Sequence, residues 1–175
     1  DDPKFIEVHR LSPFPERSLD IDVIFDLMIH HLDIVRAMVG SEVVDLEAVG
    51  VPVLSHRFDI ANVRLKFESG CIANLTASRI SRDRVRKLRV FQRDAYISID
   101  YAEQQVEAFR LDRGGAKPAI AGGTLTIEKE EPLRREIEDF VAAVREKRAP
   151  RVRGEDGRAA LAVADRIAMA MVAVT

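Results

Sequence analysis

Strict alternation of apolar and polar side chains over residues 61–68 constrains the fold of this chain more than any other feature. Ala61-Asn-Val-Arg-Leu-Lys-Phe-Glu68 alternates without interruption, and a period of two residues is typical of a strand with one buried face and one wet face. Ser69-Gly70 follows as a turn, and residues 71–78 predict the returning strand. The segment therefore predicts an antiparallel hairpin with one apolar face.

Other segments extend this hairpin into a larger sheet. Strands are predicted over residues 5–11, 43–49, 87–92, 95–101, 106–111 and 124–129, the last of them after the glycines at 114, 115, 122 and 123. Helices are predicted from a start near Asp20 or Asp22 to a stop at Gly40, and over residues 132–147 and 154–174. This order predicts an α+β fold: a large, mainly antiparallel open sheet with its helices packed on one face. The free face either meets water or packs on a second subunit, and we expect a homo-oligomer through it.

Composition excludes several classes of protein. The chain has 175 residues, a formal net charge of −2 and one cysteine, Cys71, which rules out an intrachain disulfide and favours the cytoplasm. No run of 18 apolar residues marks a membrane span. The dense basic segment 79–89 alternates with apolar residues and has few aromatic side chains, so we interpret it as a solvated strand edge and expect no nucleic acid.

The helix predicted after Asp22 carries acids and histidines at steps of 4, 4 and 3 residues: Asp22, Asp26, His30 and Asp33. At helical spacing these side chains form one stripe. Many such stripes are simply solvated faces, but those usually carry Lys and Glu, whereas this one carries short carboxylates and an imidazole. The chemical type therefore indicates a site that works with protons or binds hydroxyl groups.

Asp26 and His30 are the candidate catalytic residues. A neutral imidazole can take a proton from an alcohol, and a carboxylate one turn away can orient it; a plain surface hydrogen bond between the two is the alternative. His30, His31, Asp33 and His9 also invite a metal hypothesis. Because adjacent helical residues point about 100° apart, His30 and His31 cannot easily share one ion. We predict no metal and expect His31 to be packed or in an interface.

The segment Asp26-Leu-Met-Ile-His30-His31-Leu-Asp33 resembles the Asp-x-x-x-His-x-x-Asp helix of the glucose–fructose oxidoreductase, inositol dehydrogenase and MocA family. The resemblance covers nearly the whole chain, including His9-Arg10, the hairpin at Phe67–Gly70 and Gly154-Glu-Asp-Gly157. Residues 7–15 and 22–30 are most similar to the bacterial members that act on UDP-N-acetylglucosamine. The chain is thus expected to be the C-terminal substrate-binding and oligomerisation domain, spanning residues 1–175.

The resemblance implies a two-domain enzyme whose other, N-terminal Rossmann domain binds NAD or NADP. That domain also brings a lysine from a Glu-Lys-Pro segment, for which this chain offers no substitute, and Met28 stands where many members have glycine. The catalytic roles carry over to Asp26 and His30. Substrate contacts are expected from the following residues: His9, Arg10, Arg17, Asp33 and Arg79.

The implied reaction is oxidation of a secondary hydroxyl of a sugar or nucleotide sugar. Because the chain opens on Asp1-Asp2-Pro3 without a methionine, we expect it to be a fragment that is inactive alone and holds no cofactor by itself. The alternative is a stand-alone sugar-binding or assembly module that performs no chemistry. An in-phase dinucleotide-binding segment upstream of Asp1 would distinguish the two.

Overall fold

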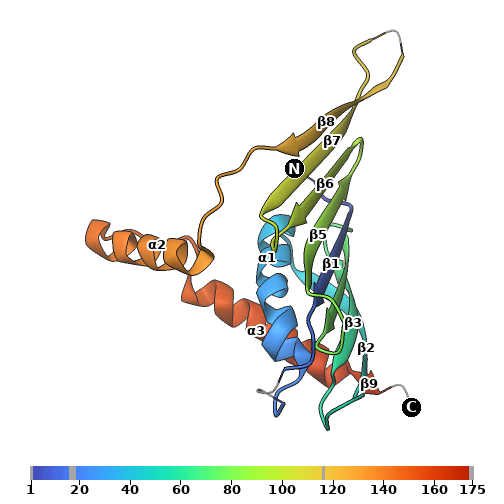
Figure 1. The fold of residues 1–175 in the computed structure, drawn as a ribbon, viewed down its shortest axis with the longest axis vertical. Coiled ribbons are helices and arrows are strands. Elements are labelled where there is room, and N and C mark those ends of the chain that lie inside the picture. The colour runs from blue at the N-terminus through green and yellow to red at the C-terminus, as the bar shows by residue number, and fades with distance from the viewer. Residues whose placement is uncertain (1, 16–18, 116, 174–175) are drawn as a thin grey trace.

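An open sheet is the main feature of the computed structural model, which describes residues 2–15, 19–115 and 117–173. Within these residues nine strands lie in the order β8-β7-β6-β5-β1-β4-β3-β2-β9 (Figure 1). β1 pairs in parallel with β4 and β2 with β9, and the other neighbours are antiparallel. The strands are β1 (Phe5–Leu11), β2 (Val43–Val51), β3 (Ile60–Phe67), β4 (Ile72–Ser78), β5 (Val85–Gln92), β6 (Ala95–Asp100), β7 (Gln105–Asp112), β8 (Ala119–Leu125) and β9 (Val172–Ala173). The predicted α+β fold with a mainly antiparallel open sheet is confirmed.

Two helical segments cover one face of this sheet. The five-residue π-helix η1 (Ile24–Met28) runs directly into α1 (Ile29–Val39), and α3 (Gly154–Ala170) lies on the same face (Figure 1). Gly40 ends α1 in a left-handed conformation with φ of 64°, as the sequence predicts. The core between sheet and helices is apolar and includes Ile6, Val8, Ile24, Met28, Leu32, Val35, Val63, Leu65, Phe67, Leu75, Leu88 and Ile167.

The alternation on β3 has the predicted consequence. Residues 61, 63, 65 and 67 are buried on the helix side, and residues 62, 64 and 66 are exposed. Cys71 is also buried, as expected of a small apolar side chain, and burial raises the pKa of its thiol. The buried side chains of this strand and its neighbours belong to the same apolar core as Leu32 and Val35 of α1.

The remaining helix, α2 (Pro132–Glu146), does not pack on the sheet. Figure 1 shows it projecting away from the other elements, and Ala143 is its one buried residue. Its large apolar side chains are exposed: Leu133, Ile137, Phe140, Val141 and Val144. The expectation that the helices share one face of the sheet therefore holds for α1 and α3 but not for α2.

Three local expectations differ from the structure. β8 spans Ala119–Leu125 rather than residues 124–129, because its glycines pair with β7 instead of preceding the strand. Gly122 has a φ of 133°, and a Cβ there would lie 2.0 Å from the Ala108 carbonyl oxygen, so the strand needs glycine at this point. β5 lies inside the sheet between β6 and β1, not at an edge. α3 ends at Ala170, and residue 174 lies outside the described residues.

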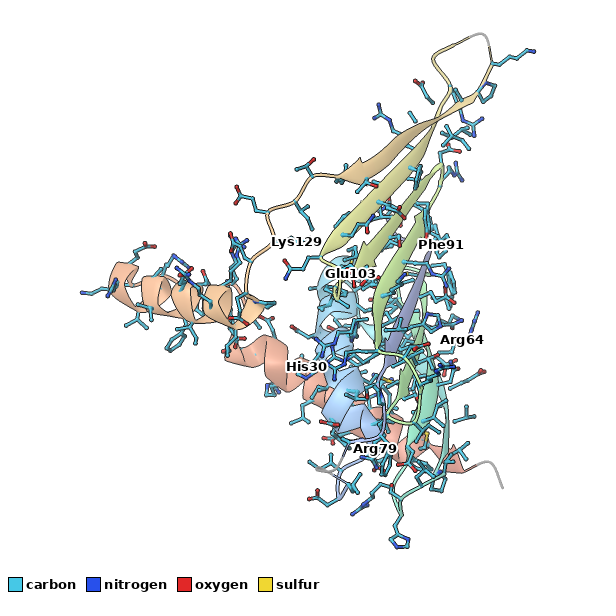
Figure 2. All side chains as sticks on the ribbon, viewed as in Figure 1. His30, Arg64, Arg79, Phe91, Glu103 and Lys129 are labelled. Atoms are coloured by element: carbon cyan, nitrogen blue, oxygen red, sulfur yellow. The ribbon has the colours of Figure 1, made fainter. Side chains whose placement is uncertain are left out.

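The sheet face turned away from α1 carries its own pattern of side chains. Four rings form a row across neighbouring strands, with centroid distances of 5.6 Å for Phe5–Phe91, 5.1 Å for Phe91–Tyr96 and 6.3 Å for Tyr96–Phe109. Figure 2 shows Phe91 and Arg64 on this outward face and His30 on the helix side. None of the helices in the described part of the chain combines the length and the hydropathy needed to cross a membrane.

Candidate active site

Most polar side chains of the segment η1–α1 lie outside the core, and His31 is the exception. Ile24, Met28, Leu32 and Val35 are buried in the core, whereas Asp26, His30 and Asp33 are not fully buried. The first turn is a π-helix, an arrangement that often marks functional sites because it shifts side chains out of regular α-helical register. Asp22, the first member of the predicted stripe, has a different role, since its carboxylate accepts a 2.9 Å hydrogen bond from the Phe58 backbone N–H.

A buried ion pair fixes the start of this helix. The Arg79 guanidinium donates to Asp59 Oδ1 at 2.8 Å, to the Ile21 carbonyl oxygen at 2.7 Å and to the Ser55 hydroxyl at 2.9 Å. The other Asp59 oxygen accepts from the backbone N–H groups of residues 53, 54 and 55 at 2.6–2.9 Å. Arg79 thereby ties the loop after β2 to Ile21, three residues before η1 begins.

Burial alone would raise the pKa of the Asp59 carboxyl. Hydrogen bonds from Ser55, from the Leu54 backbone and from Arg79 outweigh that effect and hold the pKa below its usual range. Both side chains of the pair have 0 % exposure. A guanidinium with no exposed surface has none to offer a ligand, so Arg79 is better explained as a positioning residue than as the substrate contact predicted from sequence.

His30 lies at the junction of two cavities. One, of about 410 Å³, lies between α1 and strands β1, β5 and β6, with walls that include Arg10, Arg86, Ile99 and Tyr101. The other, of about 850 Å³, lies between α1 and α2 and is also lined by Asp33 and Glu136. The imidazole therefore faces space on both sides in which a small molecule can bind.

The charges around His30 favour its neutral form. Partial burial lowers the pKa of its imidazole, Arg10 and Arg86 lower it further, and the opposing effects of Asp26 and Glu136 are smaller. A neutral imidazole at pH 7 is a proton acceptor, as general-base catalysis requires. Asp26 also raises the pKa of the Arg10 guanidinium, although burial and Arg86 lower it overall. Asp26, His30 and Arg10 thus act on one another electrostatically. All three were predicted from the sequence as site residues.

Other predicted contacts are placed differently. Ile6 and Val8 of β1 point to the helix side, so the alternation puts Arg10 with them and His9 on the outward face. His9 is therefore separated by the sheet from His30, cannot join it at one ion, and is not retained in the proposed site. Arg17 lies outside the described residues.

His31 and Arg86 border the smaller cavity and were not among the predicted site residues. His31 is 2 % exposed, consistent with the expectation of a packed residue. Its ring meets Tyr101 edge-on at a centroid distance of 5.7 Å and an interplanar angle of 84°. Neither of its ring nitrogens has a hydrogen-bond partner among the described residues. The sequence could not distinguish Arg86 from the other basic residues of segment 79–89, because only the pairing of β5 with β1 shows that it faces the helix.

The burial of His31 predicts a pH-dependent stability. Burial lowers the pKa of His31 from 6.5 to about 4, and Arg10, His30 and Arg86 add to the effect. The unfolded chain then takes up the proton first as the pH falls through 6.5, so stability is lost between pH 6.5 and about 4, by roughly 3 kcal/mol in total. Urea unfolding of the His31→Phe variant at several pH values should show a smaller loss.

The exposed His56 provides the control for this experiment. His56→Asn should keep the pH dependence of the unmodified chain. If His31→Phe loses stability with falling pH as steeply as His56→Asn does, His31 is not the group responsible.

The described residues do not fit a dinucleotide cofactor. Pyrophosphate groups of such cofactors bind where a glycine-rich turn joins a parallel strand to a helix. In the described part of the chain, the paired glycines lie in the loop before β8 and within β8, and neither pair leads directly into a helix.

The fold and the site define an α+β domain in which one helix brings an imidazole to two cavities and a carboxylate, Asp33, to one of them. The family model for the GFO/IDH/MocA C-terminal domain matches residues 4–98. This chain belongs to the GFO/IDH/MocA family of oxidoreductases, which confirms the resemblance found in the sequence.

Similar proteins extend this result. UDP-N-acetylglucosamine 3-dehydrogenase of Acidithiobacillus ferrooxidans is 38% identical over 171 residues, which are 97% of this chain and 55% of that protein. The solved structure of UDP-N-acetylglucosamine 3-dehydrogenase GnnA from the same organism superimposes with a TM-score of 0.88, over 97% of this chain and 54% of that chain. Levoglucosan dehydrogenase in complex with NADH shares the fold at 15% identity and a TM-score of 0.77, over 97% of this chain and 57% of the other. The chain thus spans about half the length of these relatives.

Proposed function

We propose that this chain is the substrate-binding and catalytic-helix half of an NAD(P)-dependent oxidoreductase that oxidises a secondary hydroxyl of a nucleotide sugar, with UDP-N-acetylglucosamine at C3 as the first candidate. One observation carries the proposal: His30, with its pKa lowered, borders two cavities. The 38% identity to UDP-N-acetylglucosamine 3-dehydrogenase over nearly the whole chain supports the choice of substrate.

In this proposal the neutral His30 accepts the proton of the reacting hydroxyl. The imidazolium that forms is stabilised by Asp26, whose charge already favours the protonated form of His30. The nicotinamide cofactor supplies the hydride acceptor when it is bound elsewhere in the complete enzyme. Asp33 borders the same cavity as His30 and is available for the other sugar hydroxyls.

A second domain is part of the proposal. The described residues do not fit the cofactor, and this chain spans only 54–55% of the relative that it matches at 38% identity. We expect an N-terminal Rossmann domain to provide the cofactor and to cover the exposed apolar side chains of α2, among them Phe140 and Val144. A helix of this kind is stabilised by burial against another surface. The chain alone should then be catalytically inactive.

The test is an assay for reduction of NAD and of NADP with UDP-N-acetylglucosamine. It is performed on this chain alone and on the longer protein expressed together with the segment encoded upstream of Asp1. Turnover by the longer protein alone would support the proposal. Turnover by the 175-residue chain would contradict the assignment of the cofactor to another domain. Saturable binding of the sugar without turnover by either protein would favour a non-catalytic sugar-binding module instead.

We also propose that a second copy of the chain covers the outward sheet face. Besides the row of rings, one row of paired residues crosses the sheet with alternating charge, running through Glu47, Arg64, Glu7, Arg89 and Glu107. Glu7 and Arg89 form an ion pair within it. A face with both signs of charge and a half-buried aromatic row is self-complementary when a copy is rotated against it.

Replacement of Phe91 by arginine is expected to weaken self-association, because it places an unpaired charge in the row of rings. Sedimentation velocity measures the effect as a shift toward the monomer. Leu54→Arg adds the same charge at a leucine that is 62% exposed and outside the sheet, and should leave the association unchanged. Equal behaviour of the two variants would place the interface elsewhere.

A further inference from the structure

Two arginines lie side by side next to His30. Arg10 of β1 and Arg86 of β5 are direct partners in the antiparallel pairing of these strands, so their side chains project from the same face. Both are half-buried. No hydrogen bond or ion pair joins either guanidinium to another of the described residues.

This arrangement is unfavourable in the absence of a ligand. Like charges directly opposite one another on a sheet repel, and burial together with Arg86 lowers the pKa of the Arg10 guanidinium. The basic residues elsewhere on β5 are paired: Lys87 contacts Asp100 at 3.2 Å, and Arg89 contacts Glu7. Arg10 and Arg86 differ from these in lacking a carboxylate partner within bonding distance.

The space in front of the pair suits a charged group with an organic part attached. Both guanidinium groups line the cavity of about 410 Å³, together with the apolar side chains of Ile34, Ile99 and Val106. Guanidinium groups donate paired hydrogen bonds that match phosphate and carboxylate oxygens. Two of them side by side complement an anion with two negative charges.

We propose that Arg10 and Arg86 form a binding site for the diphosphate group of the substrate. This inference rests on the proposed function and deepens it, because it makes the diphosphate, and not only the sugar, a determinant of recognition by this domain. The diphosphate of a nucleotide sugar is attached to the ring a few bonds from its secondary hydroxyls. A charge site that borders the same cavity as His30 is therefore suitably placed to hold the diphosphate while the base faces the ring.

The test is a calorimetric titration of the 175-residue chain with inorganic pyrophosphate at low ionic strength. The unmodified chain should bind pyrophosphate saturably, and Arg86→Gln should weaken binding by about tenfold or more. Arg64→Gln removes the same charge from the outward face, where Arg64 contacts Asn74, and should bind as the unmodified chain does. Equal affinity of the two variants, or no saturable binding, would overturn the proposal.

Thermal unfolding separates loss of binding from loss of fold. Without pyrophosphate, Arg86→Gln should melt at the same temperature as the unmodified chain or higher, because repulsion from Arg10 is relieved. Pyrophosphate should raise the melting temperature of the unmodified chain but not that of the variant. A rise of equal size in both would count against the site.

Competition identifies which diphosphate the site accepts. UDP-N-acetylglucosamine should displace pyrophosphate, whereas N-acetylglucosamine and NAD should not. Displacement by NAD alone would assign the site to the cofactor and overturn the proposal. None of these measurements needs turnover. If pyrophosphate binding depends on Arg86 but the longer protein shows no dehydrogenase activity, this inference stands and the proposed oxidation is rejected. If the longer protein turns over substrate but pyrophosphate binding does not depend on Arg86, the proposed oxidation stands and this inference is rejected.

Discussion

Replacement of His30 by alanine in the two-domain enzyme that we propose is expected to lower kcat by about 10²–10⁴-fold, the usual contribution of a general base. The variant loses the group that accepts the hydroxyl proton, while the apolar residues that hold α1 on the sheet are unchanged. Steady-state kinetics with UDP-N-acetylglucosamine and the preferred nicotinamide cofactor provide the measurement. KM should change less than kcat, because the main loss is in the chemical step.

The pH profile adds a second readout for His30. Burial, Arg10 and Arg86 lower the pKa of this imidazole, against the opposing charges of Asp26 and Glu136. The rate should therefore stay high at neutral pH and fall only as the pH drops below 6.5, the ordinary value for histidine. The alanine variant should lack this acidic limb. His56→Ala is the matched control, and an unchanged kcat for His30→Ala would reject the proposed role.

Replacement of Asp59 by asparagine is expected to lower the free energy of unfolding by about 3–5 kcal/mol, because it leaves the Arg79 guanidinium buried without its counter-charge. The effect should reach the site as well. Arg79 also holds the Ile21 carbonyl oxygen just before η1, so catalysis by the variant should decline even under conditions where it remains folded. Urea unfolding followed by circular dichroism measures the loss of stability.

The exposed pair of Arg113 and Asp94 provides the comparison for Asp59. Its atoms are 2.7 Å apart, close to the 2.8 Å of the buried pair, but both side chains are exposed to solvent. Asp94→Asn should leave stability nearly unchanged, since water and salt screen a surface pair. If Asp59→Asn and Asp94→Asn have the same unfolding midpoint, burial does not give the Arg79–Asp59 contact the importance argued above.

Local patterns were sufficient for most of the fold. The alternation from Ala61 to Phe67, the turn at Ser69-Gly70 and the stop at Gly40 each depend on residues close in sequence, and the structure confirms them. The position of β1 between β4 and β5 depends on pairings with residues 72–78 and 85–92. No local pattern contains that information. For the same reason β5, whose basic residues suggested a solvated edge, could not be recognised as an internal strand.

The candidate site shows the same division. Asp26 and His30 were found from spacing along one helix, and their assignment as catalytic residues stays a prediction. Alternation along β1 was a usable signal for His9, since apolar residues at 6 and 8 already imply that His9 points the other way. The burial of Arg79 and the pairing of Arg10 with Arg86 both require tertiary contacts. The cytoplasmic location suggested by the single cysteine also stays a prediction.

The central position of β1 has a consequence for how the chain acquires its structure during translation. Residues 5–11 are synthesised before both of their partner strands, and the later of the two is complete only at Gln92, 81 residues after Leu11. At a ribosomal rate of about 5–20 residues per second, the strand waits roughly 4–16 s before both of its neighbours exist. During that interval at least one edge of β1 lacks its neighbouring strand. The nascent chain should therefore depend on ribosome-associated chaperones for longer than a chain in which the strand equivalent to β1 forms an edge of the sheet.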